Sequence, residues 1–246
     1  MKKNTKTITI VRPKSLAAIV ADRLRDAILK TELSLGEMLS EEKIANAMNV
    51  SRTPVREALT MLQLQGLINI IPQRGSFVFK PDAADLEALV QYRLMLETQA
   101  AQLAMKANPV KAAAALGRVV AAMERASEND DAAAYTEADS SFHNVFFEFC
   151  GNHYLSQAYE IAGSRIAALR AHLSQPLGMH RGRTLREHIE IAQAFERGDA
   201  RTALGILEVH IANMRENYGK ALIALGLDED EPSPARGRRA DRGRQR

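Results

Sequence analysis

Apolar positions at helical spacing predict three short helices in the first 66 residues. The first repeat consists of Leu16, Val20, Leu24 and Ile28. Its spacing of four predicts a helix of about four turns that ends near residues 30 to 32. Ser40 is placed to cap a second, shorter helix. Ser51 is placed to cap a third, with Pro54 in the first turn, where a missing N–H is tolerated.

The third predicted helix has an apolar face and a polar face. Val55, Leu59 and Leu62 follow one another at spacings of four and three, which predicts a packed face. The positions that point elsewhere are Arg52, Thr53, Arg56, Thr60 and Gln63. This helix can therefore pack against its own domain and present a basic surface to a partner.

A small β-hairpin is predicted directly after these helices. Residues 67 to 71, apart from Asn69, and residues 77 to 79 are apolar and rich in β-branched or aromatic side chains. Between them lies the turn sequence Pro72-Gln73-Arg74-Gly75, which puts Arg74 at the tip. Helix-turn-helix followed by a hairpin is a winged helix, and we assign it to residues 14 to 81.

The texture of the sequence changes at Asp82. From there the chain is rich in Ala, Leu, Glu and Arg and lacks the alternation of strands. Helices are predicted over residues 83–106, 109–127, 131–150, 153–174, 180–197 and 199–224. The fold class is mainly α: a winged helix-turn-helix domain followed by an all-α antiparallel six-helix bundle over residues 82–226. Residues 1–13 are expected to form a flexible arm and residues 227–246 a disordered tail.

Charge is unevenly distributed along the chain. Residues 1 to 81 carry 13 Lys and Arg against 7 Asp and Glu, whereas residues 82 to 227 carry 14 against 18. Such polarity is expected of a module that meets a polyanion, joined to a domain that does not. Charge alone does not separate this interpretation from a chance imbalance on a surface.

The length and the cysteine content set outer limits on the class of protein. The 246 residues suffice for two domains, and Cys150 is the only cysteine, so no intrachain disulfide can form. No segment has the apolar core of a signal peptide or the ~20 apolar residues of a membrane span. We expect a cytoplasmic protein without membrane attachment.

The N-terminal motifs resemble the winged-helix domain of GntR-family transcriptional regulators. The matching stretches are Leu39-Ser40-Glu41, residues 50 to 59, Gly66-Leu67-Ile68 and Arg74-Gly75. The resemblance implies that Arg52, Thr53 and Arg56 contact bases or phosphates in the major groove, and that Arg74 and Gly75 approach the minor groove. Some relatives carry a DNA-contacting arginine where this chain has Glu42. In this chain the adjacent Lys43 is expected to contact the DNA backbone instead.

Arginine suits the role that the resemblance implies. Arg52 and Arg56 lie four residues apart in the N-terminal half of the helix, the part that enters the major groove in helix-turn-helix docking. The guanidinium fork can pair with guanine N7 and O6 or clamp a phosphate. The alternatives are that both arginines are solvated or paired within the helix, and that Thr53 only supports the helix start.

Three histidines and one aspartate carry the candidate chemistry of the bundle. Asp139 and His143 lie four apart and share a helix face, while His188 and His210 each lie among apolar residues of their own helices. A lone histidine on an apolar face is usually a core residue, but three with a carboxylate suit a divalent transition metal ion. Zinc is the first choice, with nickel, manganese, iron or cobalt as alternatives.

The same segment resembles the FCD effector domain of the GntR family. The matching residues are Tyr92-Arg93, Glu97, Asp139-x-x-x-His143, Gly151-Asn152, His188 and His210. The resemblance implies a metal held by Asp139, His143, His188 and His210, with a small carboxylic acid effector at or beside it. Arg93 lies on an inward stripe and can clamp an effector carboxylate, or form an internal ion pair with Glu97.

These observations predict a ligand-responsive transcriptional regulator that binds a two-fold symmetric DNA operator as a homodimer. Repression is the expected mode. One alternative is a metal-dependent enzyme of small carboxylic acids with an appended DNA-binding domain. Against it, the sequence shows no nucleophile motif and no obvious inward acid besides Asp139 to act as a general base. The other alternative is a regulator with a purely structural metal.

Overall fold

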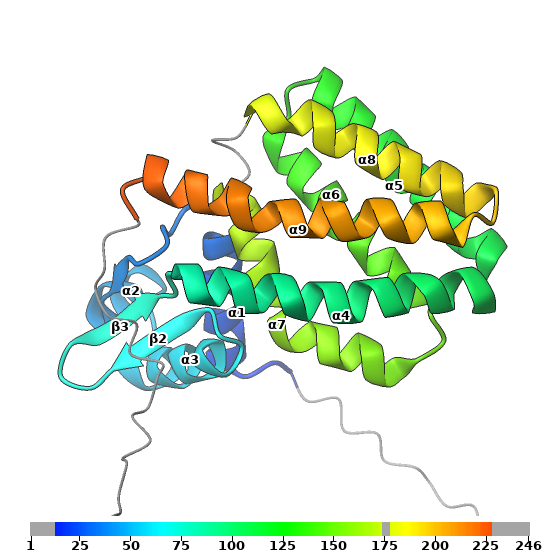
Figure 1. Ribbon diagram of the computed structural model, residues 1–246. Coiled ribbons are helices and arrows are strands. Elements are labelled where there is room, and N and C mark those ends of the chain that lie inside the picture. Colours follow the sequence, from blue (N-terminus) through cyan, green and yellow to red (C-terminus); the bar gives the residue numbers. More distant parts are fainter. Residues whose placement is uncertain (1–12, 174–177, 228–246) are drawn as a thin grey trace, which may run out of the picture.

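The computed structural model describes residues 13–173 and 178–227 (Figure 1). The predicted arm, apart from Pro13, and the predicted tail, apart from Leu227, lie outside the described residues. No helix of the described residues is both long enough and apolar enough to cross a membrane.

The N-terminal part consists of three helices and a small sheet. The helices are α1 (Leu16–Leu29), α2 (Glu41–Ala47) and α3 (Arg52–Leu64). The strands are β1 (Met38–Leu39), β2 (Ile68–Ile71) and β3 (Gly75–Val78), in the order β1-β3-β2 and antiparallel throughout. β2 and β3 are the predicted hairpin. β1 was not predicted, because two residues are too few to show an alternating pattern.

The starts of α2 and α3 differ in how they are capped. The Ser40 side chain accepts a hydrogen bond from the backbone N–H of Lys43, as expected for an N-cap. Ser51 occupies the cap position of α3 with extended backbone, but its side chain makes no capping hydrogen bond, so that part of the prediction is wrong. The connection between the helices turns at Asn49, whose φ of 50° lies in the left-handed region that asparagine tolerates.

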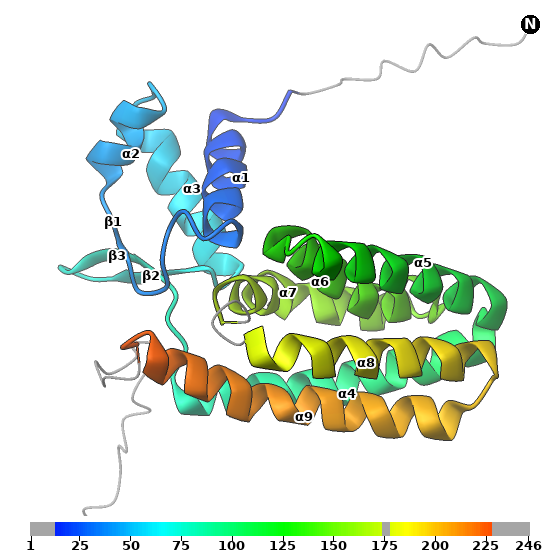
Figure 2. The same ribbon diagram turned by 90° about the horizontal axis from the view of Figure 1, so that it is seen from above.

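The C-terminal part of the described residues forms six helices within two residues of the predicted bounds. They are α4 (Ala83–Ala107), α5 (Pro109–Glu128), α6 (Ala132–Phe149), α7 (His153–Leu173), α8 (Gly178–Glu196) and α9 (Ala200–Ala224). Asp82 and Asp85 form a reciprocal capping box that fixes the first residue of α4. Helix α4 packs along α9, and α5 packs against both α6 and α8 (Figures 1 and 2).

The bundle core is apolar, and the inner helix faces that form it also carry the buried side chains of His143 and His188. Phe142 and Phe146 of α6 are fully buried and meet edge to face, with ring centroids 5.6 Å apart. Leu116 and Met123 of α5 are buried to the same degree. Polar side chains on the inner faces are therefore removed from water and need partners inside the bundle.

Helix α7 connects the bundle to the winged-helix part, which lies at one end of the bundle (Figures 1 and 2). Arg165 Nε donates to the carbonyl of Gly66 at 2.7 Å, and its guanidinium lies over the Phe79 ring, 5.9 Å from the centroid. About two turns closer to the C-terminus of α7, His172 Nε2 donates to the carbonyl of Ile28 at 2.8 Å. Gly66 has a φ of +72°, and a Cβ there would lie 2.2 Å from Arg165 Nε.

Candidate metal centre and nucleic-acid interface

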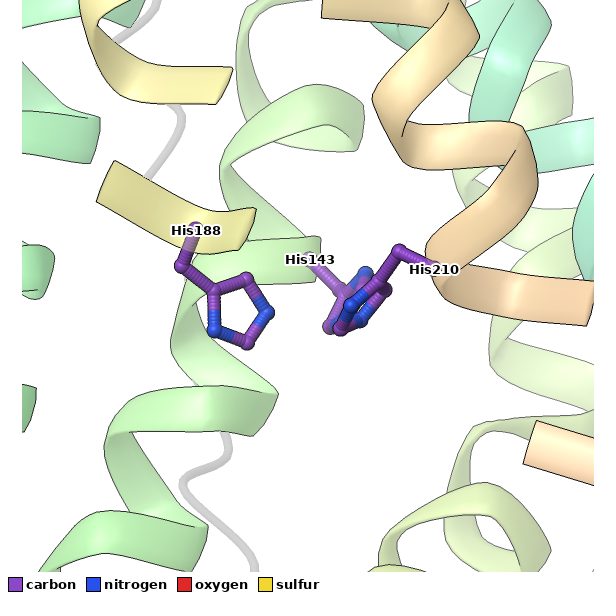
Figure 3. Close-up of side chains that lie close together, drawn as sticks. All are labelled: His143, His188 and His210. Carbon is purple, nitrogen blue, oxygen red and sulfur yellow. The ribbon is translucent and has the colours of Figure 1, made fainter. Parts of the chain in front are cut away.

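Three imidazoles from three helices meet in the bundle. His143 of α6, His188 of α8 and His210 of α9 each offer a nitrogen, and these nitrogens all lie within 4.8 Å of one another (Figure 3). His143 and His188 are fully buried, and the His210 side chain is only 9% exposed. The inward direction predicted for all three is thus what the structure shows.

Two carboxylates fix the orientation of two of the rings. His143 Nδ1 lies 2.6 Å from Glu97 Oε2, and His210 Nδ1 lies 2.8 Å from Glu187 Oε2. Each Nδ1 therefore carries the proton and donates, which leaves each Nε2 with a lone pair. The two Nε2 atoms lie 3.3 Å apart. A carboxylate behind a histidine is the usual support of a metal-ligating imidazole.

His188 has no hydrogen-bond partner for either ring nitrogen among the described residues, although it is completely buried. An unsatisfied buried imidazole is costly unless a further group completes it. Separations near 3.3 Å suit two nitrogens that each lie about 2.0–2.1 Å from one tetrahedral zinc ion. The donor set and its unmet nitrogen therefore fit a divalent transition metal.

Asp139 lies beside the three histidines but outside the group that they form. Its Oδ1 is 3.6 Å from His188 Nε2, and its Oδ2 is 2.7 Å from Arg170 Nε. Burial opposes ionisation of this carboxyl, but the Arg170 charge and the nearby imidazoles hold the pKa of Asp139 well below its ordinary value. Asp139 is therefore anionic, and its Oδ1 is available as a fourth donor beside the three histidine nitrogens.

Arg93 forms the ion pair with Glu97 that was one of its two predicted roles. Nε lies 2.5 Å from Glu97 Oε1, and Nη2 lies 3.3 Å from Oε2. The guanidinium also approaches the His143 ring, with Nη2 3.3 Å from both ring nitrogens. Its Nη1 contacts only the Met214 sulfur, at 3.0 Å, among the described residues. Because sulfur is a weak acceptor, this edge of Arg93 is the one that a stronger acceptor can take.

The electrostatics keep the histidines neutral. Burial is the largest cause that lowers the pKa of His143, to about 3, and Arg170 and Arg93 add to it while Glu97 opposes it. Burial likewise holds the pKa of His188 well below its ordinary value. Burial by itself would raise the pKa of the Glu97 carboxyl, but Arg93 and His143 keep that pKa well below its usual range. Neutral imidazoles and ionised carboxylates are the forms that bind metal.

Sequence reasoning missed Glu187 and Arg170 near the histidines, and it gave Glu97 only the role of an ion-pair partner for Arg93. We expected no obvious inward acid besides Asp139 to act as a general base, but Glu97 is fully buried and Glu187 Oε2 lies 2.8 Å from His210 Nδ1. Arg170 is 97% buried on α7 and was not considered. The pairing of Glu97 with Arg93, four residues away, was considered from the sequence, but its contact with His143 on another helix was not. Arg170 gave no comparable signal, because a single arginine in a helical pattern usually faces solvent.

The predicted DNA-contacting residues all lie on the exposed surface of the winged-helix part. Arg52, Thr53 and Arg56 are exposed on α3, Arg74 and Gly75 at the tip of the β2–β3 hairpin, and Lys43 on α2. The backbone at Gly75 has a φ of +114°, which glycine adopts without strain. The surface therefore combines the recognition helix and the wing in the arrangement that a winged helix presents to a duplex.

Two ion pairs link α3 to the first turn of α2. Arg52 Nη2 lies 2.7 Å from Glu42 Oε2, and Arg56 Nε lies 2.7 Å from Glu41 Oε2. These are the partners of the two arginines, rather than the intrahelical partners considered from the sequence. Both arginine side chains stay more than half exposed, at 54% and 64%. Both arginines are therefore ion-paired and still accessible to solvent or to a binding partner.

Two family models match this chain. The model of bacterial regulatory proteins of the gntR family matches residues 16–78, and the FCD domain model matches residues 88–213, which is just over half of the chain. The first covers the winged helix, and the second covers all the residues of the candidate metal centre.

Similar proteins with curated descriptions are regulators. The chain is 27% identical to the Uxu operon transcriptional regulator of Escherichia coli over 80% of this chain and 84% of that protein. It is 29% identical to a D-xylose utilization operon transcriptional repressor, described as probable, of Paenarthrobacter nicotinovorans, over 78% of this chain and 86% of that protein.

A solved structure with the same fold is a GntR-type regulator of Rhodococcus sp. RHA1, with a TM-score of 0.74 and 23% identity over 85% of this chain and 99% of that one. The Escherichia coli McbR/YncC structure superimposes with a TM-score of 0.70 at 20% identity, over 85% of this chain and 99% of that one. The winged helix, the histidine-bearing bundle and the matches to both family models agree: the chain belongs to the GntR family of DNA-binding transcriptional regulators, in the group that carries an FCD domain, and it is not an enzyme.

Proposed function

We propose that this regulator is a metal-containing sensor of a small carboxylic acid, and that it represses transcription from a two-fold symmetric operator as a homodimer. The observation that carries the sensor part is His188, a fully buried imidazole with both nitrogens unpartnered among the described residues, next to His143 and His210. Repression is supported by the similar D-xylose utilization operon protein, which is described as a probable repressor.

The residues that would hold the metal are Asp139, His143, His188 and His210. When bound, a divalent transition ion such as zinc supplies a Lewis acid with positions left for an anionic oxygen. Glu97 and Glu187 keep Nε2 of His143 and His210 free of protons. The protein thus presents preformed neutral donors, and metal binding removes the cost of burying His188 without a partner.

An anionic effector next to this centre has two buried guanidinium groups within reach of its carboxylate. Arg93 can exchange the Met214 sulfur for a carboxylate oxygen at Nη1. Arg170 has one nitrogen, Nη2, with no hydrogen-bond partner among the described residues. A small acid therefore replaces a weak contact and fills an unmet one, which favours an acid over a neutral ligand.

The effector acts on DNA binding through α7. Arg170 of this helix contacts Asp139 and Ser140 beside the histidines, while Arg165 and His172 contact the winged-helix part. A shift of α7 on effector binding therefore changes the position of the winged helix relative to the bundle. In a homodimer this alters the spacing of two recognition helices, which must fit half-sites about one turn of DNA apart. A ligand does so only by preferring one arrangement over the other.

Metal content and melting temperature test the sensor. Wild-type protein is expected to hold one divalent ion per chain by elemental analysis, and His188→Ala to lose it, while the exposed His153→Ala control keeps it. Small acids such as lactate, malate and citrate are then added to metal-loaded protein, and a further rise in melting temperature is expected from at least one. If metal raises the melting temperature and no acid adds to it, the metal is structural.

Footprinting tests the output. Wild-type protein is expected to protect an inverted repeat in a selected duplex, and Arg56→Ala to lose that protection while keeping its fold by circular dichroism. Equal protection by both proteins would remove Arg56 from the DNA contact. Analytical ultracentrifugation of the same samples tests the homodimer.

A further inference from the structure

The two carboxylates at the start of α2 contact different atoms of the two recognition arginines. Glu41 accepts a hydrogen bond from Nε of Arg56, and Glu42 accepts one from Nη2 of Arg52. The difference has chemical consequences, because a guanidinium recognises guanine with two parallel N–H groups. It can use its end, Nη1 with Nη2, or its side, Nε with Nη2. Both modes need Nη2.

Arg56 keeps a complete recognition edge while it is paired. Its Nη1 and Nη2 make no hydrogen bond or ion pair among the described residues, and the side chain is 64% exposed. Glu41 is less exposed, at 33%, and is fixed in the first turn of α2. The carboxylate therefore holds the guanidinium from behind, at Nε, and leaves its end directed outward for a base.

Arg52 is paired in the opposite manner. Glu42 occupies Nη2, the nitrogen common to both recognition modes, and both side chains are more than half exposed. The pair must open before Arg52 can grip a guanine with two bonds. Opening costs little, since exposed ion pairs are worth about 0–1 kcal/mol. The freed Glu42 then faces the phosphates with a like charge, which disfavours any duplex that does not reward Arg52 with good contacts.

We propose that Glu41 and Glu42 are specificity determinants with opposite actions. Glu41 is a positioning residue that aligns Arg56 for base readout. Glu42 is a competitor that neutralises the charge of Arg52 and so weakens its attraction to phosphates in non-cognate DNA. The proposal rests on the DNA contacts proposed for Arg52 and Arg56 and is independent of the metal and the effector.

Single substitutions that remove only the charge separate the two actions. Binding is measured by fluorescence anisotropy with the full chain, on a duplex selected by the wild-type protein from a random pool and on a scrambled duplex of the same composition. Glu42→Gln is expected to bind the scrambled duplex about five-fold tighter at low salt. The slope of log affinity against log salt is expected to steepen by about one, since one more cation meets a phosphate.

Glu41→Gln is expected to act on the other duplex. Its affinity for the selected duplex falls while its affinity for the scrambled one stays or rises, so the ratio of the two affinities drops about ten-fold, the value of one good bidentate contact. Asp26→Asn is the matched control, because Asp26 is an exposed acid of α1 and its loss changes the net charge equally. It is expected to leave the ratio unchanged.

Two further variants decide whether the glutamates act through the arginines. In an Arg52→Gln background, Glu42→Gln is expected to have no further effect on the scrambled duplex. A five-fold effect that persists there would overturn the competitor role, and equal behaviour of Glu41→Gln, Glu42→Gln and Asp26→Asn would overturn the whole proposal. If Arg52→Gln and Arg56→Gln themselves bind like wild type, the proposed DNA contacts fail and this inference fails with them.

Discussion

The same chemical pair, arginine with glutamate, occurs in two regions of this molecule with opposite physical properties. On the winged helix, Arg52 and Arg56 form ion pairs with acids of α2 at the solvent-accessible surface. In the bundle, Arg93 and Glu97 pair with both side chains at most 3% exposed. Water and salt weaken the first kind, whereas the second interacts across a medium of low polarity.

The difference shows what each region needs from its charges. An exposed pair exchanges partners at little cost, which suits the DNA contacts that we propose for these arginines. A buried pair cannot open without leaving a charge in an apolar surrounding, which suits a group that must stay fixed. Glu97 uses this rigidity to orient His143 through its second oxygen.

Removal of the buried acid is the strongest way to break this comparison. Glu97→Gln leaves the Arg93 charge without its counterion, and the free energy of unfolding is expected to fall by about 3–5 kcal/mol in urea titrations. The double variant Arg93→Met/Glu97→Met removes both charges and is expected to lose less stability than Glu97→Gln. A single variant as stable as the wild type would show that the buried pair is not a fixed element.

Acid is expected to act on the buried histidines with nearly as large an effect. Because the pKa of His143 is lowered to about 3 and that of His188 well below its ordinary value, the unfolded chain binds more protons than the folded one below about pH 6.5. Stability therefore falls as the pH falls, by about 2 kcal/mol per histidine from pH 7 to pH 5. The carboxylates Glu97 and Asp139, whose pKa values are lowered, add a loss of the same sign below about pH 5.

Chemical denaturation of the metal-free protein at several pH values measures this dependence. His188→Gln is expected to remove about half of the loss between pH 7 and pH 5, whereas His153→Gln, at an exposed position, changes nothing. If His188→Gln keeps the full dependence, the buried imidazole is not what makes the protein sensitive to acid.

The support behind His210 gives the next effect in size. Glu187→Gln removes the carboxylate that directs this imidazole, and metal affinity is expected to weaken about 10- to 100-fold in a competition with a chelating dye. Glu190→Gln is the matched control, an exposed glutamate one turn along α8. Unchanged affinity in Glu187→Gln would mean that His210 needs no orienting partner.

The exposed pairs complete the series with the smallest effect. Glu42→Gln is expected to change the free energy of unfolding by less than about 1 kcal/mol, although the same variant is expected to alter DNA binding. Urea titration beside Glu97→Gln measures the contrast directly. If Glu42→Gln lost as much stability as Glu97→Gln, the Arg52–Glu42 pair would not be one that opens at little cost.

The helices could be predicted from the sequence because their causes are local. The spacing of Leu16, Val20, Leu24 and Ile28 and the breaks at Asn108 and Gly198 place helix ends within two residues. The histidines could be predicted as inward for the same reason. Their supporting partners could not, because Arg170 of α7 reaches Asp139 of α6 across a distance in sequence that periodicity does not encode.

The surface pairs of α2 and α3 were beyond prediction for a related reason. Glu41 and Arg56 are separated by 15 positions, and only the turn at Asn49 brings them together. Glu42 was noticed as a departure from relatives that have arginine there, yet its contact with Arg52 depends on the angle between two helices.

The Arg165 contact to Gly66 constrains how this protein can exchange parts with others. The acceptor is a main-chain carbonyl, which every winged helix possesses, but the space for the guanidinium exists only because position 66 has no side chain. In a foreign winged helix grafted onto this bundle, a side chain at the corresponding corner would displace the Arg165 guanidinium from this carbonyl. A graft with glycine at that corner would keep both the carbonyl and the space beside it.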